Sequence, residues 1–307
     1  MKNFKPLYLI LNFLIILLCT SFTVSAKQEV VSNTSGDFET LLSNKDILKK
    51  FPSLSNSPLK SSDLIQGKEI YINYIEKVNK QTGKVLKIKN QYSKKEYLEL
   101  KNKTSVNTDI NSKSFLLSTN PINTYETTKN SWVRLTLNIY SSDRVNLDIY
   151  GYYEWLTNPY YTRDDIFGLA HDSHMVFYHN TSWSEHYWTE GGTGTLIDFK
   201  ENRIHLNSSN TSNYIGDIGG VAYKFKLGQT VGIDPETGAS VYPYGLIYVN
   251  GKKGNSSDLA SEIGLTYAHE QTGLSISPTV KIPFGTELVI SAASYYDKFK
   301  LLHTVTY

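Results

Sequence analysis

The sequence contains almost no cysteine. Its single cysteine, Cys19, lies within the first 26 residues, so the rest of the chain has none. Disulfide bonds, thiolate metal sites and a cysteine nucleophile are therefore excluded for residues 27–307. A domain without such cross-links has to be stabilised by its core, and about 280 residues are ample to form one.

Long hydrophobic runs are also absent after the N-terminus. Two lysines precede an apolar stretch at 7–18, and residues 24–26 read Val-Ser-Ala, the small-x-small pattern of a signal-peptidase site. The apolar stretch is shorter than the roughly 20 residues of a spanning helix. These features predict a signal peptide at 1–26 and a secreted chain without a membrane span. A retained N-terminal anchor is the alternative.

Neither sign of charge dominates the secreted part. Of the 31 basic residues two lie in the predicted signal peptide, which leaves 29 against 29 acidic residues. Nucleic-acid binding requires a basic face, and this balance does not predict one. The abundance of Lys, Asn, Ile and Tyr is typical of a low-GC Gram-positive bacterium.

Familiar catalytic motifs are missing as well. The sequence has no G-x-S-x-G nucleophile motif, and the glycine-rich stretch 191–194 lacks the lysine of a phosphate-binding loop. His269-Glu270 begins like a zinc-protease motif but lacks its second histidine. The sequence therefore assigns no catalytic residue.

Strand-like alternation is what the sequence has in abundance, from residue 131 to the end. In the segment WVRLTLNIY one face is wholly apolar and should be buried: Val133, Leu135, Leu137 and Ile139. Similar segments follow, separated by turn sequences that include DPETG at 234–238 and Asn250-Gly251. Many short strands with little helix predict a mainly β fold, an antiparallel β-sandwich at 131–307.

The N-terminal part is divided differently. Residues 27–69 are predicted to be a leader region, partly helical or disordered. Residues 70–100 suggest a β-hairpin followed by a short helix, with Ser93 and Glu96 in capping-box positions. A polar linker is expected at 101–130. The hairpin and helix are too small to form a core alone, so this part either packs on the sandwich or is a removed prosegment.

Acids and histidines are dense between residues 164 and 190. Carboxylates suit Ca²⁺, and imidazole with carboxylate suits Zn²⁺ or Mn²⁺. The candidate metal ligands are Asp164, Asp165, His171, Asp172 and His174. A structural Ca²⁺ is the cofactor that they suggest. The alternative is that these side chains simply hydrogen-bond to their neighbours.

Aromatic residues are also abundant, with 23 tyrosines and four tryptophans. Exposed rings on a β-sandwich can stack on sugars or peptides and offer a polar handle. The candidate ligand-binding residues are Tyr160, Tyr161, Trp183 and Trp188. Tyrosine also fills half-buried strand faces, which is the alternative explanation.

Three segments resemble a group of exported proteins of Gram-positive bacteria that has no known activity. These are YGYYEWLTNPYYTRDDIFGLAHDS, GGVAYKFKL, and the ending SEIGLTYAHEQTGLSIS with YYDKFKLLHTVTY. The similarity covers roughly 130–307. It supports export and a bacterial source, and it implies no catalytic residues.

Three functional hypotheses follow. The first is a non-enzymatic secreted protein, extracellular or associated with the cell wall, that binds an extracellular or envelope ligand. The second is a secreted hydrolase, metal-assisted or not, that uses the His/Asp/Glu cluster at 164–190. The third is a β-rich pore-forming protein, suggested by the alternation of Ser/Thr and apolar residues at 261–292.

Overall fold

The computed structural model describes residues 40–55, 58–106, 125–159, 163–190, 200–228, 232–233, 240–271, 278–291 and 293–307. All of them belong to one compact unit, Asp37–Tyr307. A second unit, Met1–Gly36, contains no described residue, and the predicted signal peptide lies within it. Among the described helices none is long and apolar enough to cross a membrane.

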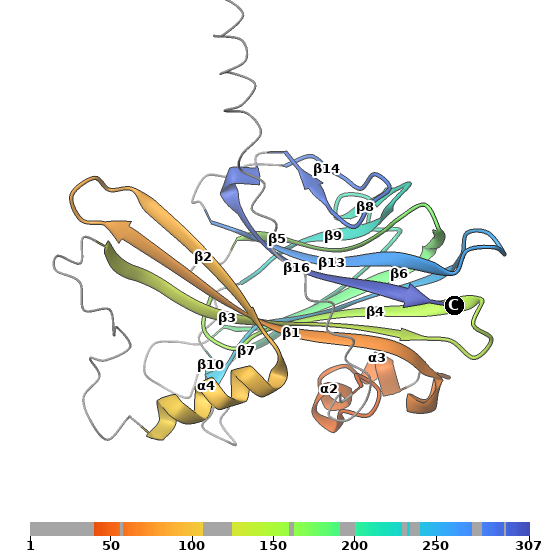
Figure 1. Cartoon of the computed structure of the whole chain (residues 1–307), viewed down its shortest axis with the longest axis horizontal. Coiled ribbons are helices and arrows are strands. Elements are labelled where there is room, and N and C mark those ends of the chain that lie inside the picture. The colour runs from red at the N-terminus through yellow and green to blue at the C-terminus, as the bar shows by residue number, and fades with distance from the viewer. Residues whose placement is uncertain are drawn as a thin grey trace, which may run out of the picture. The chain divides into compact units, whose positions relative to one another are not determined.

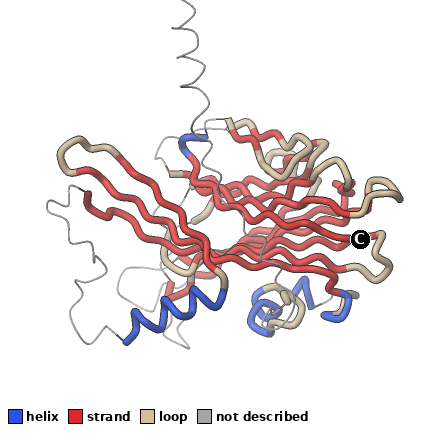
Figure 2. Tube along the Cα trace, viewed as in Figure 1, coloured by secondary structure: helices blue, strands red, loops and turns tan. Residues whose placement is uncertain are grey.

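Two antiparallel sheets form the described fold (Figures 1 and 2). The large sheet has the strand order β2-β1-β3-β4-β12-β6-β7, with bounds Val85–Tyr92, Leu64–Asn79, Tyr125–Tyr140, Asn146–Trp155, Tyr244–Lys253, Met175–Glu190 and Lys200–Asn207. The small sheet has the order β16-β13-β5-β9-β8, with bounds Tyr296–Thr306, Ala260–Glu270, Asp164–His171, Gly220–Lys226 and Tyr214–Asp217. The predicted antiparallel β-sandwich is confirmed.

Short elements complete the fold. Two strand pairs lie outside the main sheets: β10 (Gly232–Ile233) with β11 (Ser240–Val241), and β14 (Val280–Lys281) with β15 (Val289–Ile290). The helices are α2 (Lys45–Lys50), α3 (Pro52–Ser55) and α4 (Lys94–Val106), with 3-10 turns at Ser61–Asp63 and Ala293–Tyr295.

The main core fills the space between the two sheets. The predicted apolar face of β3 is fully buried there: Val133, Leu135, Leu137 and Ile139. Tyr153 of β4 stacks on Tyr267 of β13, with ring centroids 4.2 Å apart. Gly151 leaves the space that Leu265 of the opposite sheet occupies. Alternation along each strand therefore places one set of side chains in this core.

The hairpin at 64–92 is part of the large sheet. Strand β1 pairs with β3 from Leu64 to Asn79, and its residues Ile70 and Ile72 enter the main core. The boundary expected near 130 therefore falls inside strand β3, because the two segments share one hydrophobic core. Lys68 and Lys89 also donate to the carbonyl oxygens of Leu302 and Lys298 on edge strand β16, at 2.9 and 3.0 Å.

Helix α4 begins at a capping box. The Ser93 amide donates to the Glu96 carboxylate at 2.7 Å, and the Glu96 amide donates to Ser93 Oγ at 3.3 Å. The helix continues to Val106, six residues into the segment expected to be a linker. Tyr97 fixes it to the large sheet by stacking on Tyr71, with ring centroids 4.4 Å apart.

Part of the expected leader packs on the outer face of the large sheet. Leu41, Ile47, Phe51 and Leu54 are at most 4% exposed. Together with tyrosines of the sheet they form a second hydrophobic cluster, separate from the main core. We call residues 40–55, which include α2 and α3, the N-terminal cover.

One expected turn is wrong. Asn250 and Gly251 lie inside strand β12, paired with Asp148 and Leu147 of β4. The dipeptide continues the strand because its neighbours on both sides supply ladder partners, which a local turn signal cannot reveal. The expected turn at 234–238 lies outside the described residues.

Candidate functional site

The five candidate metal ligands lie at the two ends of one strand. Asp164 and Asp165 begin β5, whereas His171 ends it and Asp172 and His174 follow. Asp172 lies seven positions after Asp165 along an extended strand, which corresponds to roughly 23 Å between them. The five side chains therefore do not converge on a single ion.

At the first end of β5, Asp165 is fully buried within a polar network. Its carboxylate accepts hydrogen bonds from the Tyr267 hydroxyl and the Glu270 amide, and lies 3.0 Å from His269 Nδ1. Trp155 Nε1 in turn donates to the Tyr267 hydroxyl at 2.9 Å. Burial, reinforced by the charge of Asp165, raises the pKa of Tyr267 well above its usual value, so the phenol stays protonated and donates.

At the other end, Asp172 fixes the turn between β5 and β6 to strand β13. Its carboxylate accepts from Ser261 Oγ at 2.7 Å and from the amides of His174 and Glu262, each at 2.9 Å. Burial opposes ionisation, but these hydrogen bonds outweigh it and lower the pKa of Asp172. This carboxylate is satisfied by the protein itself.

No group of three or more His, Cys, Asp or Glu side chains in the described part of the chain could hold a metal ion. The acids and histidines of the proposed hydrolase cluster are also dispersed. His186 is fully buried and stacks on Phe225 of the small sheet, whereas Glu185 points to the outer face of the large one. Neighbouring residues on a strand face opposite ways, so these two cannot act on one substrate.

The two candidate tryptophans of β6 also lie on opposite faces. Trp188 packs against the main core, and Trp183 contacts Tyr248 and His205 on the outer face. Tyr160 and Tyr161 lie outside the described residues. Only Trp183 among the described candidates is therefore placed where a ligand could reach a sheet surface.

Trp183 belongs to a row of rings that crosses four adjacent strands of the large sheet, β4, β12, β6 and β7. Tyr150 on β4 lies 4.7 Å from Tyr248 on β12, measured between ring centroids. Tyr248 lies 5.4 Å from Trp183 on β6, and Trp183 lies 5.7 Å from His205 on β7. We call these four residues the aromatic strip.

The strip becomes more accessible along its length. Tyr150 is 4% exposed and belongs to the cluster beneath the N-terminal cover. Tyr248 and Trp183 are partly exposed, and the His205 side chain is 48% exposed. Tyr178, on the same strand as Trp183, is 36% exposed. Tyr248 and Trp183 pack against the edge of the same cluster while remaining partly exposed.

Polar side chains flank these rings. Asp148 accepts from the Tyr248 hydroxyl and from Asn250 Nδ2, both at 2.6 Å. Glu185 lies 3.1 Å from His205 Nδ1 and accepts from Ser53 Oγ of the cover at 3.2 Å. Both acids accept hydrogen bonds from side chains of the protein, so this surface combines apolar ring area with hydrogen-bonding groups.

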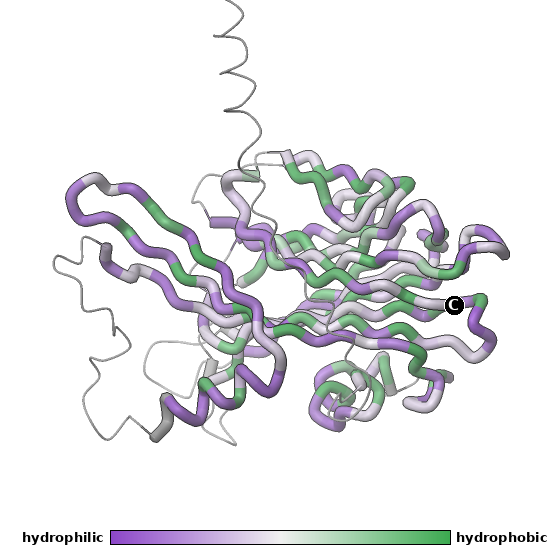
Figure 3. The backbone as a smooth tube through the Cα atoms, in the orientation of Figure 1, coloured by the Kyte–Doolittle hydropathy of each residue, from purple (hydrophilic) through white to green (hydrophobic). Residues whose placement is uncertain are grey.

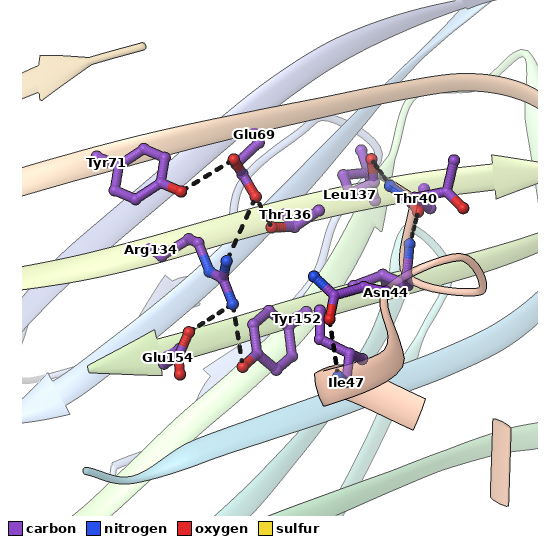
Figure 4. Close-up of polar contacts among 12 residues, drawn as sticks. Thr40, Asn44, Ile47, Glu69, Tyr71, Arg134, Thr136, Leu137, Tyr152 and Glu154 are labelled. Atoms are coloured by element: carbon purple, nitrogen blue, oxygen red, sulfur yellow. Dashed lines mark hydrogen bonds and ion pairs between the residues drawn. The ribbon is translucent and has the colours of Figure 1, made fainter. Parts of the chain in front are cut away.

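An ion-pair network lies elsewhere on the same outer face (Figure 4). Arg134 lies between two acids, 2.5 Å from Glu154 and 3.8 Å from Glu69. Lys50 of α2 also contacts Glu154, at 2.7 Å. Burial opposes ionisation of Glu154, but Arg134 and Lys50 outweigh it and lower its pKa. The network ties α2, β1, β3 and β4 together, which is a structural role.

Sequence patterns missed most of the strip. The alternation places Tyr150, Tyr248 and Asp148 on the solvent side of their strands, but no local pattern shows that β4, β12, β6 and β7 are neighbours. The row exists only because β12 inserts between β4 and β6.

Comparison with known proteins adds little. No family model matches the chain, and no curated protein is significantly similar to it. One matching solved structure is the collagen-binding domain from a Staphylococcus aureus adhesin, with 12% identity and a TM-score of 0.28, covering 54% of this chain and 90% of that one. A TM-score this low does not establish a shared fold.

Proposed function

We propose that this chain is a secreted, non-enzymatic binding protein that holds an extracellular or envelope saccharide polymer on the aromatic strip. The observation that carries the proposal is the row of contacting rings from Tyr150 to His205, whose exposure rises from 4% at Tyr150 to 48% at the His205 side chain. The signal-peptide pattern at 1–26 supports export.

The chemistry of the strip favours a neutral, hydroxyl-rich ligand. Aromatic side chains offer large apolar contact area together with polar tips, which suits sugar rings. Asp148 and Asn250 provide acceptors and donors beside Tyr248, as a hydroxyl-rich ligand requires. Binding sites of this kind combine a largely apolar surface with a few polar groups that set orientation.

The length of the strip favours a polymer over a small molecule. The rings span four strands, which are spaced by roughly 4.8 Å in a sheet. An extended chain lying across the strands could therefore contact several rings in succession. A single small ligand would contact only one or two.

The proposal can be tested with a glycan array and with suspensions of peptidoglycan, chitin and cellulose, using the chain from Lys27 onward. We expect at least one of these polysaccharides to retain the protein, and Trp183→Ala to lower its affinity by roughly thirty-fold, the loss expected for a binding hot spot. Leu302→Ala removes another exposed apolar side chain, on β16, and serves as the matched control.

Two results would contradict the proposal. One is that no polysaccharide retains the wild-type protein. The other is that Trp183→Ala and Leu302→Ala are retained equally well, which would place the binding surface elsewhere. Melting curves of both variants would show whether each remains folded.

A further inference from the structure

The balanced overall charge hides a local excess of lysine. Residues 64–106 contain ten lysines and four glutamates, with no arginine or aspartate. This segment comprises β1, β2 and α4. The excess is therefore concentrated in one hairpin and the helix that follows it.

The outer half of this hairpin extends past the neighbouring strand β4. The last residue of β4, Trp155, pairs with Val133 of β3, whereas Ile75 of β1 pairs with Asn130, which precedes Val133. From Ile75 outward the hairpin therefore has β3 but not β4 beside it. Figure 1 shows this part of β1 and β2, with the first part of β3 on the same side, running away from the rest of the strands. We call residues 75–88 the lysine arm.

Several lysines of the arm and of α4 are exposed. The Lys80 side chain is 60% exposed, and its ion pair with Glu126 is also at the surface. Four further lysines of this segment are exposed and form no salt bridge with a described residue: Lys84, Lys95, Lys101 and Lys103. By contrast, Lys87 and Lys89 are directed to Asp297 of β16, at 3.1 and 3.7 Å.

Exposed aliphatic side chains accompany these lysines. Val85 is 48% exposed and Leu86 44% exposed, on opposite faces of the hairpin, beside the turn that forms its tip. Leu98 of α4 is also 44% exposed. Figure 3 shows hydrophilic stretches along the hairpin interrupted by hydrophobic ones. Tyr97 holds α4 on Tyr71 of β1, on the face of the hairpin that also carries Leu86, whereas Val85 is on the opposite face.

We propose that the lysine arm and α4 bind the surface of a membrane that contains anionic phospholipid. Lysines near such a surface are attracted by its negative potential. Val85 and Leu86 follow the turn at the tip of the hairpin, where side chains of both faces can enter the boundary between headgroups and acyl chains. A soluble polyanion would attract the lysines equally but would gain nothing from Val85, Leu86 or Leu98, and these residues therefore favour a lipid surface.

The test is vesicle flotation with the chain from Lys27 onward, which keeps every described element and omits the apolar signal segment. Vesicles of equal parts phosphatidylglycerol and phosphatidylcholine are compared with vesicles of phosphatidylcholine alone. We expect binding only to the anionic vesicles. It should be lost in about 1 M NaCl, where the screening length falls to about 3 Å.

Two double variants separate the charged from the apolar contribution. Lys80→Glu with Lys84→Glu should weaken binding at least 25-fold, since each lysine near an anionic surface contributes about five-fold. Val85→Ser with Leu86→Ser should weaken it by roughly ten-fold, through loss of apolar area. The control, Lys226→Glu with Lys281→Glu, changes exposed lysines of the small-sheet side and should bind like the wild type.

The outcomes distinguish this proposal from its alternatives and from the proposed function. Absence of binding to anionic vesicles, or equal binding by all variants, would overturn it. An effect of the lysine variant alone, with the Val85/Leu86 variant unchanged, would also overturn it and would indicate a soluble polyanion instead. Trp183→Ala should leave vesicle binding unchanged, so failure of the saccharide proposal would not affect this result.

Discussion

The two faces of the large sheet are built from the same strands but differ in what they pack against. On β4, Tyr153 and Trp155 face inward and pack against Tyr267 and Phe299 of the small sheet. The outward residues of β4 instead meet the N-terminal cover, the Arg134 network and the aromatic strip. The inner face is mostly apolar, with His186 among its few buried polar side chains, whereas the outer face is divided into regions with different chemistry.

This difference indicates which face contributes most to stability and which face could bind a ligand. The inner face has a single task, to exclude water between two sheets, and apolar burial accomplishes it. The outer face is covered only in part, so its uncovered rings and their polar neighbours remain accessible. We therefore expect substitutions on the inner face to change stability strongly, and substitutions on the aromatic strip to change binding with less effect on stability.

The largest effect is expected on the inner face. Leu135→Ala removes a fully buried side chain and leaves a cavity, which should lower the free energy of unfolding by about 3 kcal/mol. Chemical denaturation monitored by tryptophan fluorescence measures this change. Leu302→Ala on β16, where the side chain is 41% exposed, is the control and should change stability by less than about 0.5 kcal/mol. Similar losses for both variants would contradict a core at this face.

A smaller effect is expected in the Arg134 network. Glu154→Gln leaves the guanidinium of Arg134 partly uncompensated and should lower stability by about 2 kcal/mol, because breaking a buried ion pair exposes the desolvation cost of the remaining charge. Glu126→Gln breaks the exposed pair with Lys80 and should cost no more than about 0.5 kcal/mol. Equal losses in parallel denaturation curves would show that the network is not buried as described.

The burial of histidines also predicts that the free energy of unfolding falls in acid. Burial lowers the pKa of four histidines below 6.5: His171, His179, His186 and His303, the last to about 4. These groups stay neutral in the folded chain, while the unfolded chain takes up protons below about pH 6.5. Their contribution to stability is therefore present above pH 6.5 and is lost as the pH falls towards about 4.

His303→Gln should reduce this sensitivity. The variant should lose about 1 kcal/mol less than the wild type between about pH 7.5 and about pH 5, after allowance for the partial exposure of this side chain. Urea denaturation at both values measures the difference. His174 provides the matched control, because Asp172 raises the pKa of this exposed histidine and its titration acts in the opposite direction. A stability that rises on acidification would contradict the burial of these histidines.

We expect a chelator to leave the stability of the protein unchanged, because the described candidate metal ligands do not form one site. Asp165 and Asp172 already accept three hydrogen bonds or more from the protein, and they lie at opposite ends of β5. EDTA should therefore leave the melting temperature unchanged, and elemental analysis should find no stoichiometric Ca²⁺. A chelator-sensitive melt with one bound ion per chain would restore the structural calcium hypothesis.

The fold was largely predictable from the sequence, because alternation depends on each strand alone. Val133, Leu135, Leu137 and Ile139 identify a buried face without reference to any other segment. The assignment of β1 to the same sheet was not predictable, since its partner residues on β3 lie 46 to 76 positions further along the chain. The packing of the N-terminal cover on the outer face of the sheet was not predicted, for the same reason.

The candidate site was less predictable than the fold. Trp183 was identified by composition, but its neighbours Tyr248 and His205 come from strands that only the topology brings together. Trp188 was selected on equal grounds and lies on the opposite face, packed against the core. Asp165 and Asp172 resemble metal ligands in sequence because their hydrogen-bond donors, Tyr267 and Ser261, lie about a hundred residues away.

Hydroxyl-radical footprinting tests the central claim most directly, with the chain from Lys27 onward free and bound to the polysaccharide that retains it. The account predicts protection of Trp183, Tyr248 and Tyr178 on binding, with no change at the exposed side chains Phe284 and Leu302. Protection at Phe284 or Leu302, with the aromatic strip equally oxidised in both states, would contradict it.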